Sequence, residues 1–175
     1  MFDVEHISFD TSGLILRQSE QRKKLWLNGY NDILELRAFP TKPDIPVLLS
    51  NKQALLEYYQ RAAKTQNAVV LDLAVQQVAS IRAVYLTMFA PAKPKGHTYV
   101  SSLALPFRDG SFVLKIQALE TIARDDLSSK SDALYPAHGL TRTRAEIQRL
   151  ANSITLEAKL QKAAKFQAGL FGILR

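Results

Sequence analysis

The stretch TYVSSLALPFRDGSFVLKIQAL, residues 98–119, places an Asp-Gly pair between two apolar runs. Asp109-Gly110 suits the positive φ angles of a two-residue hairpin loop. In the return strand every second side chain is apolar, and those sharing this face are Phe112, Leu114, Ile116 and Ala118. Lys115 and Gln117 fall on the other face. Because side chains alternate between the two faces of a strand, the stretch predicts an antiparallel hairpin with one face toward a core.

The segments before this hairpin predict further strands of the same sheet. Loose alternation over 6–15 predicts a first strand. The letters RQSEQRKKLWLNGYNDILELRAF, residues 17–39, then predict a polar turn, a short apolar strand and a reversal at Asn28-Gly29. Alternation and β-branched or aromatic composition indicate the remaining strands over 32–39, 68–76 and 81–89.

The first expected helix follows a proline-rich loop. FPTKPDIPVLLS, residues 39–50, contains three prolines, which remove backbone donors and disfavour a continuous helix or a central strand. Ser50 and Gln53 have the spacing of a capping box at a helix start. Apolar residues then recur at helical spacing, so an amphipathic helix is expected over 51–66.

A second amphipathic helix is expected near the C-terminus. Segment 121–140 is acidic and serine-rich, which predicts a mobile loop. Thr143 and Glu146 repeat the capping-box spacing after this loop. The apolar residues that follow at helical spacing are Ile147, Leu150, Ala151, Ile154 and Ala158.

Together these elements predict an α+β fold: an antiparallel six- to seven-stranded sheet with helices packed on it as an α/β/α sandwich. The 175 residues, 47% hydrophobic and 22% charged, are typical of one globular core. The absence of cysteine excludes disulfides, thiolate metal sites and cysteine nucleophiles. The N-terminal letters MFDVEHISFD lack a signal-peptide pattern, so a cytoplasmic protein is expected. No catalytic or cofactor-binding motif was found, so no cofactor is expected.

The loop APAKPKGHTY is the first candidate binding site. Lys93, Lys95 and His97 lie among prolines and a glycine, and such restrained cations can hold an acidic group. The alternative is a stiff hairpin connection kept soluble by its lysines. The histidines at 6, 97 and 138 have no metal-ligand spacing, so no metal site is predicted.

The tip of the central hairpin is a second candidate, with Arg108 as a contact to a ligand or a partner. A small enzyme is the alternative hypothesis, in which Arg108, Asp109, His97 and His138 converge on one cleft built from loops. This hypothesis requires their side chains to lie within about 10 Å of one another, close enough to act through one water.

The basic C-terminal region suggests a third candidate surface. Its cations are Arg142, Arg144, Arg149, Lys159, Lys162 and Lys165. Weak nucleic-acid binding is an alternative function, but few aromatic residues alternate with these charges, so nucleic acid is an unlikely partner. The apolar tail GLFGILR is expected to pack on the domain or on a second copy, with a homodimer through the helix or tail as one form. Attachment to a membrane surface is the other option.

The element order, with TYVSSLALPFRDGSFVLKIQAL and LANSITL, resembles the PsbP-like (Mog/PsbP) fold over residues 6–160. That resemblance implies one domain over 1–166 and a separate tail at 167–175. The blocks WLNGYNDILELR, YLTMFAP and YPAHGLTRTRAEI are similar to those of a family of uncharacterised bacterial proteins. That family has no established activity. The PsbP-like resemblance implies a non-enzymatic protein-binding or adaptor module, and an immunity or accessory protein of a bacterial toxin or secretion system is one such role.

Overall fold

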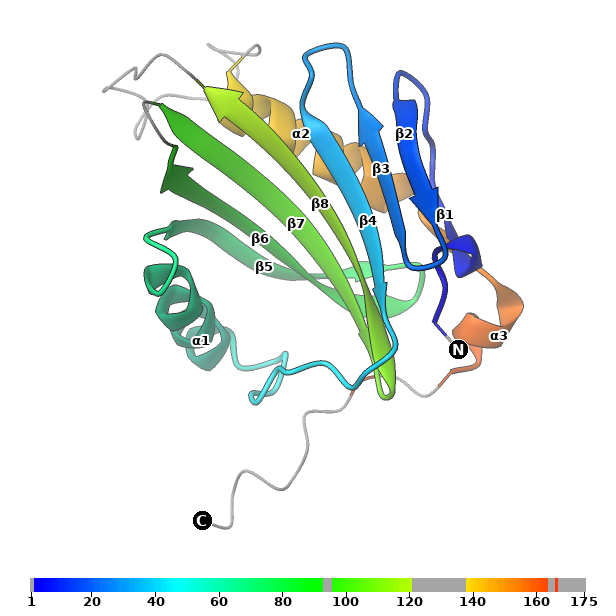
Figure 1. Ribbon diagram of the computed structural model, residues 1–175. Helices are drawn as coiled ribbons and strands as arrows, with labels where there is room; N and C mark the ends of the chain where they lie inside the picture. The colour runs from blue at the N-terminus through cyan, green and yellow to red at the C-terminus, as the bar shows by residue number, and fades with distance from the viewer. Residues whose placement is uncertain (1, 93–95, 121–137, 164–165, 167–175) are drawn as a thin grey trace.

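One seven-stranded antiparallel sheet dominates the computed structural model, which describes residues 2–92, 96–120, 138–163 and 166 (Figure 1). The strand order across the sheet is β2-β3-β4-β8-β7-β6-β5. The strands are β2 (Ile15–Glu20), β3 (Lys23–Leu27), β4 (Ile33–Phe39), β5 (Val69–Val78), β6 (Ile81–Pro91), β7 (His97–Phe107) and β8 (Gly110–Glu120). The predicted α+β class with six to seven antiparallel strands is confirmed.

The helices lie on both faces of this sheet. They are the 3-10 turn η1 (Val4–His6), α1 (Lys52–Lys64), α2 (Gly139–Ser153) and α3 (Ala158–Gln161). Helix α2 packs across β7 and β8, and α1 packs against β5 on the opposite face (Figure 1). A two-residue pair, β1 (Ile7–Ser8) with β9 (Thr155–Leu156), joins the two ends of the chain.

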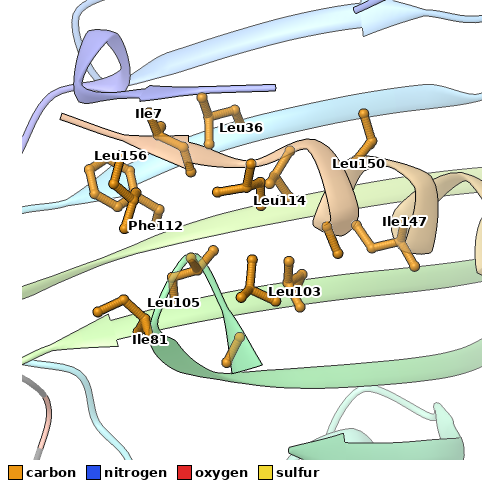
Figure 2. Packing of buried hydrophobic residues seen from close by; sticks show 14 of the residues in the cluster. Ile7, Leu36, Ile81, Leu103, Leu105, Phe112, Leu114, Ile147, Leu150 and Leu156 are labelled. Atoms are coloured by element: carbon orange, nitrogen blue, oxygen red, sulfur yellow. The ribbon is translucent and has the colours of Figure 1, made fainter. Parts of the chain in front are cut away.

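The larger core cluster lies between the sheet and α2 (Figure 2). Leu114 pairs with Leu36 of β4 and with Leu103 of β7, and all three side chains are buried. Ile147 and Leu150 of α2 belong to the same cluster and are fully buried. The alternation predicted for the central hairpin is therefore confirmed, because Phe112, Leu114 and Ile116 belong to this cluster and Ala118, on the same face of β8, is also buried.

A smaller cluster lies between the other face and α1. Leu55 of α1 packs with Leu49 of the proline-rich loop and with Val84 of β6. Tyr59, one turn after Leu55, packs against the same three residues. Farther along this face, Phe39 of β4 is 37% exposed, so the cover that α1 supplies is partial.

The β7–β8 connection differs from the expected loop. Phe107 pairs with Gly110, so the two loop residues are Arg108 and Asp109, and neither has a positive φ. The glycine is needed for a different reason: a Cβ at Gly110 would lie 2.3 Å from the ring of Phe2. Asp109-Gly110 correctly indicated the hairpin, but close approach of an aromatic ring explains the glycine.

The first strand of the sheet also differs from the prediction. Residues 15–20 form β2 and pair with β3, where a strand over 6–15 and a polar turn were expected. Most side chains of β2 are exposed because it is an edge strand, so it lacks the apolar alternation that identifies a half-buried strand. Within the expected segment, Ile7 and Ser8 pair with β9, and Ile15, its last residue, begins β2 opposite Leu27.

Both helix starts were misplaced. The side chain of Asn51, not Ser50, caps α1, and its Oδ1 accepts from the Ala54 N–H at 3.1 Å. Helix α2 begins at Gly139, so the last residues assigned to the loop over 121–140 belong to the helix. The rest of that loop lies outside the described residues.

Thr143 lies inside α2 instead of capping it. Its buried hydroxyl donates to the Leu140 carbonyl and accepts from Ser101 of β7, each at 3.1 Å. Helix α2 ends at Ser153, earlier than the apolar spacing through Ala158 predicted. At Ile154 the backbone becomes extended, which allows β9 to pair with β1.

Replacing Ala79 by Asn together with Ser80 by Gly should raise the free energy of unfolding by about 1 kcal/mol. These two residues connect β5 to β6 with φ angles of 45° and 68°. Such angles strain residues with a Cβ, whereas Asn-Gly adopts them readily. Urea unfolding measures the gain. The matched control places the same Asn-Gly pair at Arg108 and Asp109, where neither φ is positive, and should give no gain in stability. An equal gain at both loops would contradict the prediction.

Tyr59→Phe should reduce the loss of stability at alkaline pH. Burial, helped by the neighbouring Tyr58, raises the pKa of Tyr59 to about 12. The unfolded phenol ionises near pH 10, so the folded state holds its proton longer. Stability from this group is complete below about pH 10 and falls as pH rises toward about 12. Urea unfolding at about pH 8 and pH 11 should show a smaller decline for the variant, and an unchanged decline would contradict this.

Candidate interaction surface at one end of the sheet

The fold brings two of the predicted site residues to the same end of the sheet. His97 opens β7 opposite Glu120 at the end of β8, and His138 caps α2 by accepting from the Leu140 N–H through Nδ1. Tyr99 lies between them, with its ring centroid 5.0 Å from that of His138. Phe89 adds ring contacts of 5.6 Å to His97 and 6.3 Å to Tyr99. Lys93 and Lys95 lie outside the described residues.

These rings lie near a carboxylate at the start of α2. Glu120 accepts from the Gly139 N–H at 2.6 Å, so its negative charge meets the N-terminus of the helix. Partial burial, and then the charge of Glu120, raises the pKa of Tyr99 and keeps its phenol neutral. His97 Nδ1 is buried and has no hydrogen-bond partner among the described residues. The cluster therefore combines aromatic rings with the carboxylate of Glu120.

Arg108 and Asp109 lie at the opposite end of the sheet from the histidines (Figure 1). Strand β7 separates them from His97, and its 11 residues span about 33 Å at roughly 3.3 Å per residue. The two side chains pair with each other, Nη2 to Oδ2 at 2.8 Å, and both are about two-thirds exposed. The hypothesis that Arg108, Asp109, His97 and His138 converge on one cleft is therefore wrong.

Arg142 reaches from α2 to two other elements. Its guanidinium donates to both carboxylate oxygens of Asp32, at 2.9 and 2.8 Å, and to Glu120 at 3.3 Å. The side chain of Asp32 is 2% exposed and that of Arg142 is 13% exposed. The hydrogen bonds to Asp32 are the main cause that raises the pKa of Arg142. Expected as a binding residue, Arg142 holds α2 against the sheet.

The β3–β4 turn positions the partner of Arg142. The side-chain oxygen of Asn28 accepts from the N–H groups of Tyr30 and Asp32, at 2.9 and 3.0 Å. Asn31, not Gly29, takes the positive φ of 61°, so the expected reversal is present with a different residue in the left-handed region. Tyr30 at the tip is 64% exposed, and its ring lies 4.9 Å from the Arg142 guanidinium.

Exposed aliphatic residues flank the same end on the other face of the sheet. Ile33 at the start of β4 is 43% exposed, and Leu119 near the end of β8 is 57% exposed. Ile33 pairs with Gln117, so Leu119 is its diagonal neighbour, about 7–8 Å away. We call this end of the sheet the histidine rim; its residues are Tyr30, Ile33, His97, Tyr99, Leu119 and His138.

The aromatic and aliphatic members of the rim were missed at the sequence level. Tyr30 stands in the polar turn NGYND, and a large aromatic residue at a turn tip is a usable signal for a recognition point. Ile33 and Leu119 give no such signal, because an apolar residue in a strand is usually assigned to the core. Their exposure depends on how far α1 extends over the sheet.

The other basic residues of the C-terminal region mostly face carboxylates. Arg144 pairs with Asp72 of β5, Arg149 pairs with Asp10 and Glu146, and Lys159 pairs with Glu157. They belong to two helices, α2 and α3, instead of one continuous basic helix. Ion pairing of this kind reduces the charge available to phosphates. Lys165 lies outside the described residues.

Neither a metal site nor a membrane-spanning helix occurs among the described residues. Within the described residues, no three His, Cys, Asp or Glu side chains lie together in a way that could hold a metal ion. No helix in the same part of the chain is long and apolar enough to cross a bilayer.

No protein-family model matches the sequence, and no curated protein matches it. Among solved structures, the chain is similar to a point mutant of the protein Mog1, with a TM-score of 0.57 and 12% identity, over 89% of this chain and 94% of that chain. It is also similar to LpqN, described as involved in cell envelope biogenesis of Mycobacterium tuberculosis, with a TM-score of 0.46 and 13% identity over 86% and 82%.

The likeness to Mog1 identifies the class of fold. The chain has the α+β fold of Mog1 and the PsbP-like proteins, as its element order predicted. At 12% identity the likeness to Mog1 concerns the fold alone. The resemblance to a bacterial family stays a prediction.

Proposed function

We propose that this protein is a protein-binding or adaptor module that contacts its partner through the histidine rim. One observation carries the proposal: Tyr30, Ile33 and Leu119 are 64%, 43% and 57% exposed at the same end of the sheet. Tyr30 lies beside Arg142 of α2, and Ile33 and Leu119 lie on the opposite face, so exposed apolar side chains border this end of the sheet on both faces. Exposed large apolar side chains of this kind are typical of interaction surfaces. Tyrosine is also among the residues that contribute most to protein interfaces.

The rim is supported by contacts that hold its shape before a partner arrives. Tyr30 rests on Arg142, which the buried Asp32 holds in place, and Tyr99 packs against His138. Side chains already ordered in this way lose little conformational entropy on binding. The geometry therefore favours recognition of a complementary folded surface with apolar and aromatic groups.

The specific role that we propose is that of an immunity or accessory protein in a bacterial toxin or secretion system. Its support is the resemblance to PsbP-like domains, which are mostly binding or adaptor modules, and the Mog1-like fold offers a compatible scaffold. The similar blocks of a bacterial family suggest a bacterial setting but carry no activity of their own. Nucleic acid is a weaker candidate, because arginines 144 and 149 are paired with carboxylates.

Affinity capture from the native host with single variants tests this proposal. Tyr30→Ala and Leu119→Asp should each lose a protein that the wild type captures. Ile15→Asp on β2 is the matched control, since Ile15 is 55% exposed but lies on an edge strand outside the rim, and it should keep that protein. Circular dichroism verifies that all three variants fold.

The outcomes separate the general and the specific proposals. A captured protein that binds both rim variants as well as it binds the wild type would overturn binding through the rim. A rim-dependent partner that is a toxin or a secretion component supports the specific role. A rim-dependent partner of another class retains the binding module and rejects that role.

A further inference from the structure

A groove on the α1 face of the sheet lies away from the histidine rim. It encloses about 320 Å³, and the residues of its lining that matter here are Phe39, Ile45, Tyr59, Ala104 and Val113. It lies between the proline-rich loop, α1 and the strands β4, β7 and β8. Apolar groups predominate among these side chains, so an apolar occupant would fit.

The chain itself arrives beside this groove near its C-terminus. Leu160 of α3 belongs to the cluster on the α2 face, whereas Phe166 packs against the cluster on the α1 face. Leu160 and Phe166 therefore pack on opposite faces of the sheet. Ile45, Tyr59 and Ala104 pack against the same small cluster as Phe166, and all three line the groove.

The nine residues after Phe166 have a composition suited to the groove. They read QAGLFGILR, and the large apolar ones are Leu170, Phe171, Ile173 and Leu174. An extended chain of nine residues reaches at most about 30 Å, which is more than enough to cross a groove that begins beside its anchor. Four large apolar side chains in nine residues would otherwise remain in water, at roughly 1.5–3 kcal/mol each.

We propose that residues 167–175 bind in this groove of their own chain. Phe166, the last described residue before the tail, packs against the same cluster as groove residues Ile45 and Tyr59, and the exposed Phe39 and half-buried Val113 offer apolar surface for the tail. This contact completes the cover over the sheet face that α1 leaves partly open. It does not depend on the histidine rim, which lies at the other end of β8.

The complete lack of cysteine permits a direct test by disulfide trapping in the full chain. Val113→Cys is combined in turn with Leu170→Cys, Phe171→Cys, Ile173→Cys and Leu174→Cys. A disulfide needs Cβ atoms about 3.5–4.5 Å apart, so at least one tail position should be trapped. Thr41→Cys, on the exposed edge of the groove, repeats the test if Val113→Cys folds poorly.

The matched control places the first cysteine at Ile15, which is exposed on β2 and distant from the groove. Under mild oxidation we expect a disulfide within the monomer to form at least ten times faster for the groove pair than for the control pair. Non-reducing electrophoresis separates the products. Equal rates at groove and control would overturn the proposal, and so would trapping only between two chains, which would assign the groove to the tail of a second copy.

Discussion

Arg142→Ala is expected to lower the free energy of unfolding by about 3–5 kcal/mol. The substitution would leave Asp32 buried, with a side chain that is 2% exposed, and would remove both charged hydrogen bonds to it. A buried carboxylate without a cation pays a desolvation penalty that water cannot relieve. The same change removes the ion pair between Arg142 of α2 and Glu120 of β8.

Urea unfolding of the wild type and the variant measures this loss. Arg144→Ala is the matched control on the same helix. The side chains of Arg144 and its partner Asp72 are 28% and 43% exposed, and ion pairs exposed to this extent contribute about 0–1 kcal/mol to stability. A cost for Arg142→Ala no larger than that of the control would show that the Asp32 pair does not hold α2 in place.

Phe112→Ala is expected to cost about 3–5 kcal/mol, the usual loss for a large aromatic residue in a core. Phe112 is fully buried, and its ring lies 5.4 Å from that of Phe2 and 6.1 Å from that of Phe107. Removing it leaves a cavity at the end of the larger cluster, where the N-terminal residues meet the β7–β8 hairpin.

The opposite face of the same strand supplies the control. Lys115→Ala removes a side chain that is 36% exposed and lies 3.7 Å from Glu35, so the cost should stay below about 1 kcal/mol. Thermal unfolding of both variants compares the two faces directly. Similar losses at both positions would contradict a sheet with one fully buried face in this region.

Much of the sheet could be predicted because its signals are local. The alternation in 112–118 and the Asp-Gly pair each depend on neighbours in sequence, and β7 and β8 follow from them. Strand β2 could not be found in this way, since an edge strand exposed on most of its side chains has no apolar face to display. The start of α2 was also missed, because its N-cap is His138 and histidine is not among the residues that usually cap helices.

The candidate site could be predicted only in part. His97 and His138 were predicted as candidate binding residues, and the structure places both at one end of the sheet. Arg108 was grouped with them, although an 11-residue strand carries it to the opposite end. Arg142 stays a predicted binding residue, and its bidentate pair with the distant Asp32, which no local pattern indicates, explains why most of its side chain is buried.

The sequence alone determined that this chain forms an antiparallel sheet with a core on one face, because a side-chain period of two is a local property of each strand. Only the tertiary structure decided which residues meet. Arg142 and Asp32 are 110 positions apart, and the strand order that joins them depends on packing across the whole sheet. The Asp-Gly pair indicated a hairpin. The reason that position 110 requires glycine is the ring of Phe2, distant in sequence, which leaves no room for a Cβ there.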